Sequence, residues 1–166
     1  GDVYKRQVSK VTNMQYMFYY ARAFNGPLNG WERTDSTVGN VTNMQYMFYD
    51  ARAFNQPLDQ WNVTKVTNKE GMFARAYAFN QPLENWERTD STVGNVTNMK
   101  EMFKNASSFN QPLEQWNVGN VTTMEKMFCD ASAFNQPLEQ WNVGNVTTME
   151  GMFYGASSFN QPIGQW

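Results

Sequence analysis

The sequence predicts an α/β repeat protein, a solenoid in which each coil of about 25 residues holds a short helix followed by a short parallel strand. Three observations lead to this prediction. A Met-Phe pair recurs at regular intervals along the chain, and the apolar residues around it have the spacing of a helix. A proline then follows in every repeat and disfavours continuation of that helix.

The Met-Phe pair marks six repeat units. It lies at residues 17–18, 47–48, 72–73, 102–103, 127–128 and 152–153, so the intervals are 30, 25, 30, 25 and 25 residues. All 11 methionines, 12 phenylalanines, 6 tryptophans and 6 prolines occupy positions of one motif. A fixed period of roughly 20 to 50 residues is typical of proteins whose neighbouring repeats complete one shared core.

The units are predicted to form one domain. Residues 1–7, GDVYKRQ, do not fit the motif and are interpreted as an out-of-frame leader of the kind that cloning or assembly leaves. Residues 8–166 are predicted to be a single solenoid of six repeats, a fragment of a longer array, because the last unit stops without a polar cap. Two identical stretches, WERTDSTVGNVTNM at 31–44 and 86–99, lengthen two of the intervals by five residues.

The second unit illustrates the predicted helix, which spans residues 42–54. Its apolar residues recur at i, i+3, i+4, i+7 and i+10: Met44, Met47, Phe48, Ala51 and Phe54. Thr42 and Gln45 match the T-x-x-Q capping box that begins a helix. Pro57–Trp61 is the predicted strand, with Leu58 and Trp61 as apolar anchors.

Stacked copies of one coil are expected to place identical residues in ladders, phenylalanine on phenylalanine and tryptophan on tryptophan. The asparagine after the last phenylalanine of each unit is expected to form another ladder that satisfies backbone groups. Lys69 replaces a motif methionine. Its stem is expected to lie along the core while its ammonium reaches water, which would make this coil a local weak point.

Composition excludes several classes of function. A formal net charge of −2 gives no reason to expect nucleic-acid binding, and no apolar run has the roughly 18 residues of a membrane span. The chain has no histidine, one cysteine, no phosphate-binding glycine loop and no catalytic set outside the repeat. We therefore expect no enzyme activity, no catalytic residues, no cofactor and no metal.

The motif V-T-N-M-x-x-M-F-x-x-A-x-x-F-N-Q-P-L-x-x-W-N-V resembles the short repeat of BspA-like leucine-rich-repeat surface proteins of bacteria. The resemblance covers residues 8–166. It implies a leucine-rich-repeat-like solenoid, which the general handedness of parallel crossovers would make right-handed. It also implies an extracellular or cell-surface location and a role in adhesion or protein binding, without an active site in the repeat.

Two groups of residues are candidates for partner binding. The first is a set of tyrosines on the outer face of the predicted helices: Tyr16, Tyr19, Tyr46 and Tyr49. Exposed tyrosines are enriched at interfaces, although these could simply pack on one another. The second is the charged part of the two insertions: Glu32, Arg33, Asp35, Glu87, Arg88 and Asp90. Cys129 is expected to be exposed and incidental.

The predicted function is a non-catalytic surface module for adhesion or protein–protein interaction. The expected partner is a protein or glycan on another cell or matrix, and the chain is expected to be monomeric or part of a longer chain. Three alternatives remain open: a carbohydrate-binding module whose tryptophans stack on sugars, a passive spacer stalk, and ice binding through the threonine row from Thr12 to Thr147.

Overall fold

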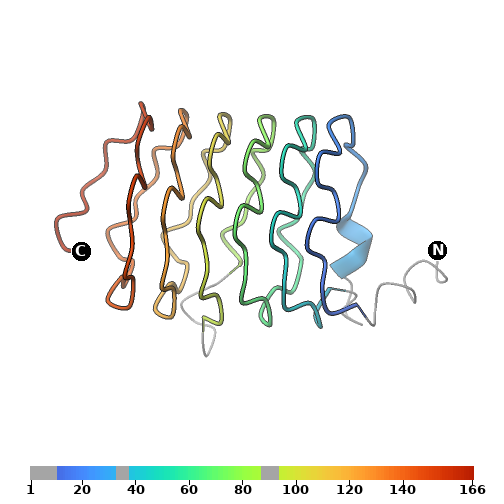
Figure 1. The fold of residues 1–166 in the computed structure, drawn as a ribbon, viewed down its shortest axis with the longest axis horizontal. Coiled ribbons are helices and arrows are strands. Elements are labelled where there is room, and N and C mark those ends of the chain that lie inside the picture. The colour runs from blue at the N-terminus through green and yellow to red at the C-terminus, as the bar shows by residue number, and fades with distance from the viewer. Residues whose placement is uncertain (1–10, 33–37, 87–93) are drawn as a thin grey trace.

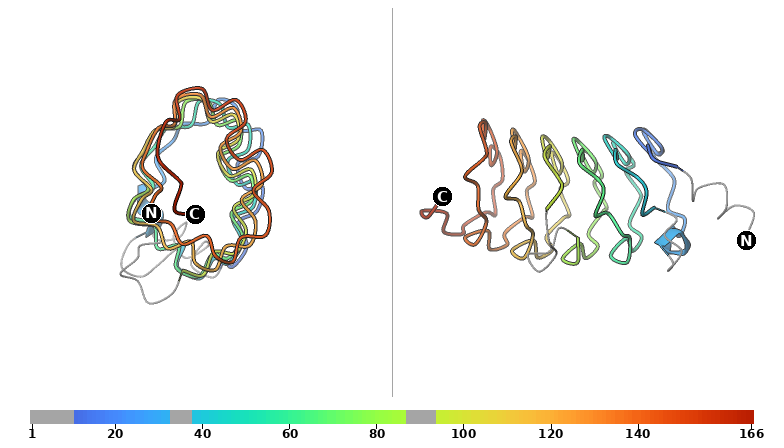
Figure 2. Two further views of the ribbon diagram at one scale, coloured as in Figure 1. Left: turned by 90° about the vertical axis from the view of Figure 1, so that its left-hand side faces the viewer. Right: turned by 90° about the horizontal axis from the view of Figure 1, so that it is seen from below.

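The structure, a computed structural model, describes residues 11–32, 38–86 and 94–166. These residues form a column of coils that lie side by side along one axis (Figure 1). Viewed along that axis, the coils superpose as loops around a shared interior (Figure 2). Parallel bridges link one position of each coil to the next, in the order Asn13, Asn43, Asn68, Asn98, Thr123 and Thr148. The predicted leader, residues 1–7, lies outside the described residues.

The predicted α/β leucine-rich-repeat-like right-handed solenoid is wrong. Among the described residues, the helical content is one 3-10 helix, η1 (Asn29–Glu32), and the β-structure consists of isolated bridges without a sheet. The bridges also lie just before the Met-x-x-Met-Phe segment, not at Pro57–Trp61, where a strand was predicted. The described coils therefore contain neither half of the predicted helix-plus-strand unit.

The segment predicted as a helix is a run of consecutive turns. In the second coil the N–H groups of Met47, Tyr49 and Ala51 each donate to the carbonyl three residues earlier, over 3.1–3.2 Å. The N–H groups of the residues between them donate instead to carbonyls of the next coil. Phe48, for example, donates to the carbonyl of Met72 over 2.9 Å. Alternate backbone groups therefore close turns and join coils, whereas a helix would use them all within one segment.

Left-handed residues make these turns possible. Tyr46 and Asp50 have φ angles of 54° and 57°, which suits the third position of a type II turn. The equivalent positions hold Gly71, Asn105, Asp130 and Gly155, among others, all with positive φ. Glycine, asparagine and aspartate tolerate this conformation best. Their recurrence was the sequence signal against a helix, and Tyr16, Tyr46 and Glu101 at the same kind of position obscured it.

The core consists of aromatic ladders, as predicted. Both phenylalanines of each coil stack on their counterparts in the next coil, with ring centroids 5.4–6.1 Å apart. Trp31 stacks on Trp61 at 6.0 Å. Trp61 is buried, and its indole N–H donates to the carbonyl of Leu28 in the preceding coil. Identical side chains thus fill the interior because each coil packs against its own copy.

The asparagine ladder is also confirmed. The Oδ1 atom of Asn25 accepts the backbone N–H of Asn55 at 2.8 Å and the side-chain amide of Gln56 at 3.2 Å. In the second to fifth coils, too, the asparagine Oδ1 accepts the backbone N–H of the asparagine in the coil that follows.

The predicted capping box is wrong, because the Thr42 hydroxyl donates to the Thr12 carbonyl of the preceding coil instead.

Lys69 departs from its predicted placement. Its side chain is fully buried, so the ammonium does not reach water, and the Nζ atom lies 5.6 Å from the ring centroid of Trp86. This position holds a buried methionine in the coils on either side, Met44 and Met99.

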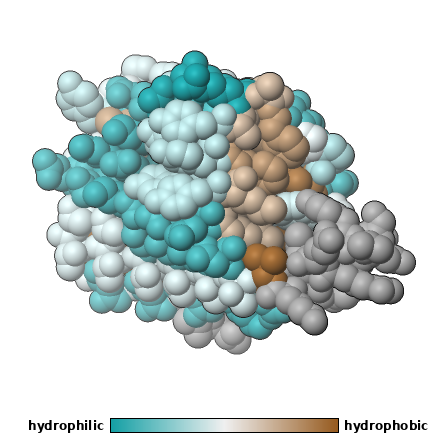
Figure 3. Space-filling model, turned by 45° about the vertical axis from the view of Figure 1, so that its right-hand side comes forward, coloured by the Kyte–Doolittle hydropathy of each residue, from teal (hydrophilic) through white to brown (hydrophobic). Residues whose placement is uncertain are grey.

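The first coil has a described neighbour on one side only. Met17 is 43% exposed, whereas Met47 at the equivalent position is fully buried. Figure 3 shows hydrophobic atoms gathered in a strip on this side of the molecule.

Among the described residues, no helix has the length and apolar character that are needed to cross a membrane.

Candidate binding surface

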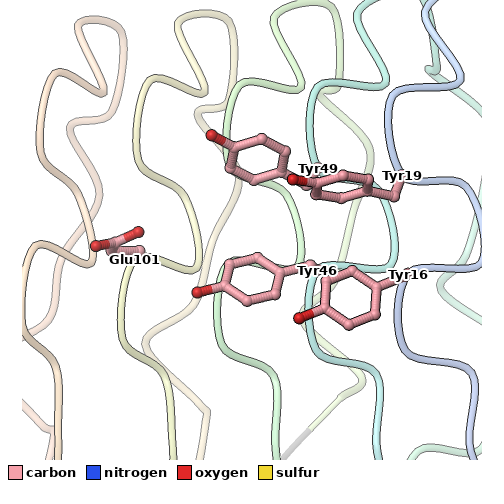
Figure 4. Close-up of a pocket in the computed structure, with 5 residues that line it drawn as sticks. All are labelled: Tyr16, Tyr19, Tyr46, Tyr49 and Glu101. Carbon is pink, nitrogen blue, oxygen red and sulfur yellow. The ribbon is translucent and has the colours of Figure 1, made fainter.

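Four of the predicted site residues lie together. Tyr16, Tyr19, Tyr46 and Tyr49 line a surface pocket of about 290 Å³, and Glu101 completes it; we call this set the tyrosine pocket. In Figure 4 the rings form two rows, Tyr19 with Tyr49 and Tyr16 with Tyr46, and Glu101 faces them from a later coil. The sequence prediction identified the tyrosines but missed Glu101.

Small residues in the third coil create the pocket. Where the first two coils carry tyrosines, the third has Gly71 and Ala74. A Cβ atom on Gly71 would lie only 2.3 Å from the ring of Tyr46, so that ring extends over the glycine. Gly71 also has a φ of 58°, which glycine adopts without strain. The step from large to small side chains at one repeat position leaves the hollow between Tyr46 and Glu101.

The four tyrosine rings hold one another in place. Tyr16 and Tyr46 stack with centroids 5.5 Å apart, and Tyr19 and Tyr49 stack at 5.1 Å. Within each coil the two rings meet edge to face, at 5.3 Å for Tyr16 with Tyr19 and 5.7 Å for Tyr46 with Tyr49. Both geometries are favourable for aromatic pairs. The rings therefore form a rigid surface, although Tyr16 and Tyr19 remain 46% and 42% exposed.

Hydrogen bonds orient Tyr46 within this group. Its hydroxyl donates to Oε1 of Glu70 at 3.0 Å, while Oε2 of Glu70 accepts from the side-chain amide of Gln45 at 3.0 Å. Burial raises the pKa of Tyr46, and the hydrogen bond to Glu70 and the negative charge of Glu70 raise it further. Tyr46 is consequently a neutral phenol at physiological pH.

Beside the pocket, three arginines surround one buried carboxylate. Nε of Arg22 donates to Oδ2 of Asp50 at 2.7 Å, and Nε atoms of Arg52 and Arg75 donate to Oδ1 at 3.0 and 3.1 Å. Burial would raise the pKa of Asp50. The hydrogen bonds from Arg52 and Arg22 and the positive charges outweigh that effect, so its pKa lies below its usual value. We call this group the arginine cluster.

The sequence prediction missed the arginine cluster because its members lie in three different coils. Two of them, Arg22 and Arg52, occupy one repeat position in adjacent coils, whereas Arg75 occupies a position that holds Asp50 one coil earlier. The recurrence of arginine at one position was visible in the sequence. The convergence of the third arginine on the same carboxylate depends on the stacking of the coils.

The other predicted site residues belong to the two insertions. Glu32 is the last residue of η1, and five residues of the insertions lie outside the described residues: Arg33, Asp35, Glu87, Arg88 and Asp90. The single cysteine, Cys129, is buried, whereas exposure was predicted. Burial raises the pKa of the Cys129 thiol, and the adjacent carboxylate of Asp130 raises this pKa further. Among the described residues, no three Cys, Asp or Glu side chains cluster as a metal site.

The stacked coils define the class of protein, a tandem-repeat module whose identical core positions stack along one axis. The chain belongs to the family described as "Mycoplasma protein of unknown function, DUF285", whose model matches residues 1–95 and 88–166. This match supports a repeat family of unknown function and does not support the BspA-like leucine-rich-repeat identity that the motif implied. No curated protein and no solved structure matches the chain.

Proposed function

We propose that this chain is a non-catalytic, cell-surface repeat module that binds a partner protein through the tyrosine pocket. The observation that supports this most directly is the arrangement of four tyrosine rings around an open pocket of about 290 Å³. Rigid tyrosines bring a large contact area to an interface and have little conformational entropy to lose. The extracellular location is part of the proposal and is supported by the resemblance of the motif to bacterial surface-protein repeats.

The non-catalytic part of the proposal is supported by the chemistry of the pocket. Its lining consists of four phenols and one carboxylate. A neutral phenol that donates a hydrogen bond to a carboxylate, as Tyr46 does to Glu70, is a poor nucleophile. These groups suit recognition by stacking and hydrogen bonding.

Carbohydrate binding through stacked tryptophans has less support. Trp86 and Trp116 are buried, and their indole N–H groups donate to carbonyls of Leu58 and Leu83 in the preceding coils. A buried indole offers no face to a sugar ring. A glycan partner would have to contact the tyrosine pocket instead.

The test compares two variants in a binding screen against purified matrix proteins and glycans. Tyr19→Ser/Tyr49→Ser removes one row of the tyrosine pocket. Tyr154→Ser is the matched control, because Tyr154 occupies the same repeat position in the last coil and is 74% exposed. We expect the parent and the control to bind the same protein and the double variant to lose at least about tenfold in affinity, as for removal of interface tyrosines elsewhere.

Circular dichroism of each variant separates loss of the site from loss of the fold. A folded double variant that binds as well as the parent would contradict the proposed site. Binding to glycans alone would favour the carbohydrate alternative, and no binding by the parent would favour the spacer stalk.

A further inference from the structure

The arginine cluster has more positive charge than its buried carboxylate needs. Three guanidinium groups surround the single negative charge of Asp50, so the group has a net charge of +2. One bidentate arginine is enough to pair both oxygens of a carboxylate. The additional guanidinium groups repel one another, and in the described part of the chain no further ion pair offsets their charge.

The geometry leaves the outer parts of the guanidinium groups available. All three hydrogen bonds to Asp50 use the Nε atom, the one nearest the stem. The side chains of Arg22, Arg52 and Arg75 remain 54%, 42% and 35% exposed. The terminal nitrogens of a guanidinium held in this way can donate to a second acceptor on its solvent side.

Neighbouring aromatic rings hold the arginines in this arrangement. The guanidinium of Arg22 lies 5.3 Å from the ring centroid of Tyr20, and that of Arg52 lies 5.6 Å from the ring of Tyr77. A guanidinium that is already positioned by a ring and a carboxylate loses little freedom when it binds a ligand. The cluster is therefore preorganised for an anion.

We propose that the arginine cluster is an anion site that binds a carboxylate of the partner protein. A planar carboxylate matches the fork of a guanidinium. The site adjoins the tyrosine pocket, because the ring of Tyr20, which lies against Arg22, packs edge to face on Tyr19 at 4.4 Å and on Tyr49 at 5.6 Å. A single acidic segment of a partner can reach both. The assignment to a partner protein rests on the proposed function, whereas the binding of an anion does not.

The chain as a whole favours a discrete acidic ligand over an extended polyanion. Its formal net charge is −2, so the chain as a whole has no excess of positive charge. Extended polyanions bind through many distributed cationic contacts. A net charge of +2 confined to one cluster instead suits one or two neighbouring carboxylates.

The test is an NMR titration of the arginine Nε–H signals, which the buried carboxylate protects from exchange with water. The probes are a capped tetraglutamate peptide, a capped tetraglutamine peptide and sodium sulfate, all at one ionic strength. We expect saturable shifts of the Arg22, Arg52 and Arg75 signals with tetraglutamate and none with tetraglutamine. Sulfate binding without tetraglutamate binding would overturn the carboxylate assignment, and the absence of any shift would overturn the anion site.

Two variants locate the site. Arg22→Gln leaves two arginines on Asp50, so we expect a folded protein that binds tetraglutamate about tenfold more weakly, as expected for loss of a charge-assisted bidentate contact. Lys65→Gln makes the same change in charge at an exposed lysine that bonds to Asn40, and should bind as the parent does. Unchanged affinity in folded Arg22→Gln would refute the site.

If Arg22→Gln does not fold, Arg22→Lys is the second variant. It keeps the charge but lacks the fork, so binding should still weaken, and affinity equal to that of the parent would refute bidentate recognition. The small peptide probes require no natural partner. Failure of the matrix-protein screen therefore leaves this titration intact, and failure of the titration leaves the proposed function standing.

Discussion

Lys69 occupies a core position at which every other coil has methionine. The five counterparts are Met14, Met44, Met99, Met124 and Met149. Burial lowers the pKa of Lys69 to about 7, because the interior disfavours the charged ammonium. Trp86 compensates in part, since its ring lies 5.6 Å from Nζ and attracts the cation.

The lowered pKa of Lys69 predicts how stability depends on pH. The unfolded chain keeps this proton up to about pH 10.4, whereas the folded protein releases it near pH 7. Between these values the unfolded state binds more protons, so the free energy of unfolding should rise with pH. Urea denaturation at pH 6 and pH 9.5 tests this. Lys69→Met should be more stable by roughly 1–3 kcal/mol at pH 6 and should show a smaller pH slope. Equal slopes in both proteins would contradict the prediction.

Asp50 makes the opposite contribution at acid pH. Its pKa is depressed by the arginines, so it stabilises the fold above its unfolded pKa of about 3.9 and loses that effect as the pH falls through the folded value. Asp50→Asn keeps the left-handed backbone but leaves three guanidinium groups without their counter-charge. We expect a loss of roughly 3–5 kcal/mol at pH 7, measured by chemical denaturation.

Asp130→Asn is the matched control for this substitution. Asp130 occupies the same repeat position, with a φ of 56°, but its side chain is exposed and forms no ion pair with an arginine of the described residues. Its stability should change by less than about 0.5 kcal/mol. Similar losses in the two variants would mean that the backbone position, and not the ion pairs, is responsible.

At the scale of the coil, the apolar positions could be predicted and the backbone could not. Met44, Met47, Phe48, Ala51 and Phe54 are all buried, as the helical spacing suggested. Consecutive turns place the same residues inward, so periodicity alone does not distinguish them from a helix. The turns differ from a helix in the acceptors of alternate backbone N–H groups. These acceptors are carbonyls of the neighbouring coil, which the sequence of one coil does not reveal.

The asparagine ladder gives a prediction at this scale. Oδ1 of Asn80 accepts the backbone N–H of Asn110 at 2.9 Å and the side-chain amide of Gln111 at 3.0 Å. Asn80→Ala removes both of these hydrogen bonds and leaves the backbone N–H of Asn110 without the Oδ1 acceptor. Thermal and urea denaturation should show a loss of about 1–3 kcal/mol.

Asn160→Ala is the control for the ladder. Asn160 donates its backbone N–H to Asn135, as its counterparts do, but its Oδ1 accepts no hydrogen bond among the described residues. Its substitution should change stability by less than about 0.5 kcal/mol. A loss of stability as large as that of Asn80→Ala would indicate that asparagine stabilises the ladder through the backbone conformation it favours. The hydrogen bonds accepted by its side chain would then not be the cause.

At the scale of the whole molecule, the direction of the backbone hydrogen bonds predicts that amide hydrogens exchange more slowly in the fifth coil than in the sixth. In the fifth coil the N–H groups of Lys126, Phe128 and Asp130 donate to carbonyls of the sixth, over 2.7–2.9 Å. The equivalent N–H groups of Gly151, Phe153 and Gly155 have no acceptor among the described residues. Hydrogen exchange followed by NMR should be at least about 100-fold slower for the first group. Equal exchange rates in the two groups would contradict the stacking.

The candidate binding surface also belongs to this scale. The tyrosine pocket could be predicted in part, because four tyrosines at two repeat positions suggest a shared face. Glu101 and the arginine cluster could not, since each depends on which coils become neighbours and on the small residues Gly71 and Ala74 between them. A repeat period specifies equivalent positions but not how far each side chain reaches into the next coil.

The sequence by itself determined that the chain is a tandem repeat, which residues form the core, and that phenylalanine, tryptophan and asparagine stack on their own kind. These features follow from periodicity, because equivalent residues must meet when identical units pack. Only the tertiary structure decided the backbone of each coil, the burial of Lys69 and the convergence of three arginines on Asp50. The physical reason is that half of the backbone donors in the turn segment, and the partners of these charged side chains, belong to neighbouring coils.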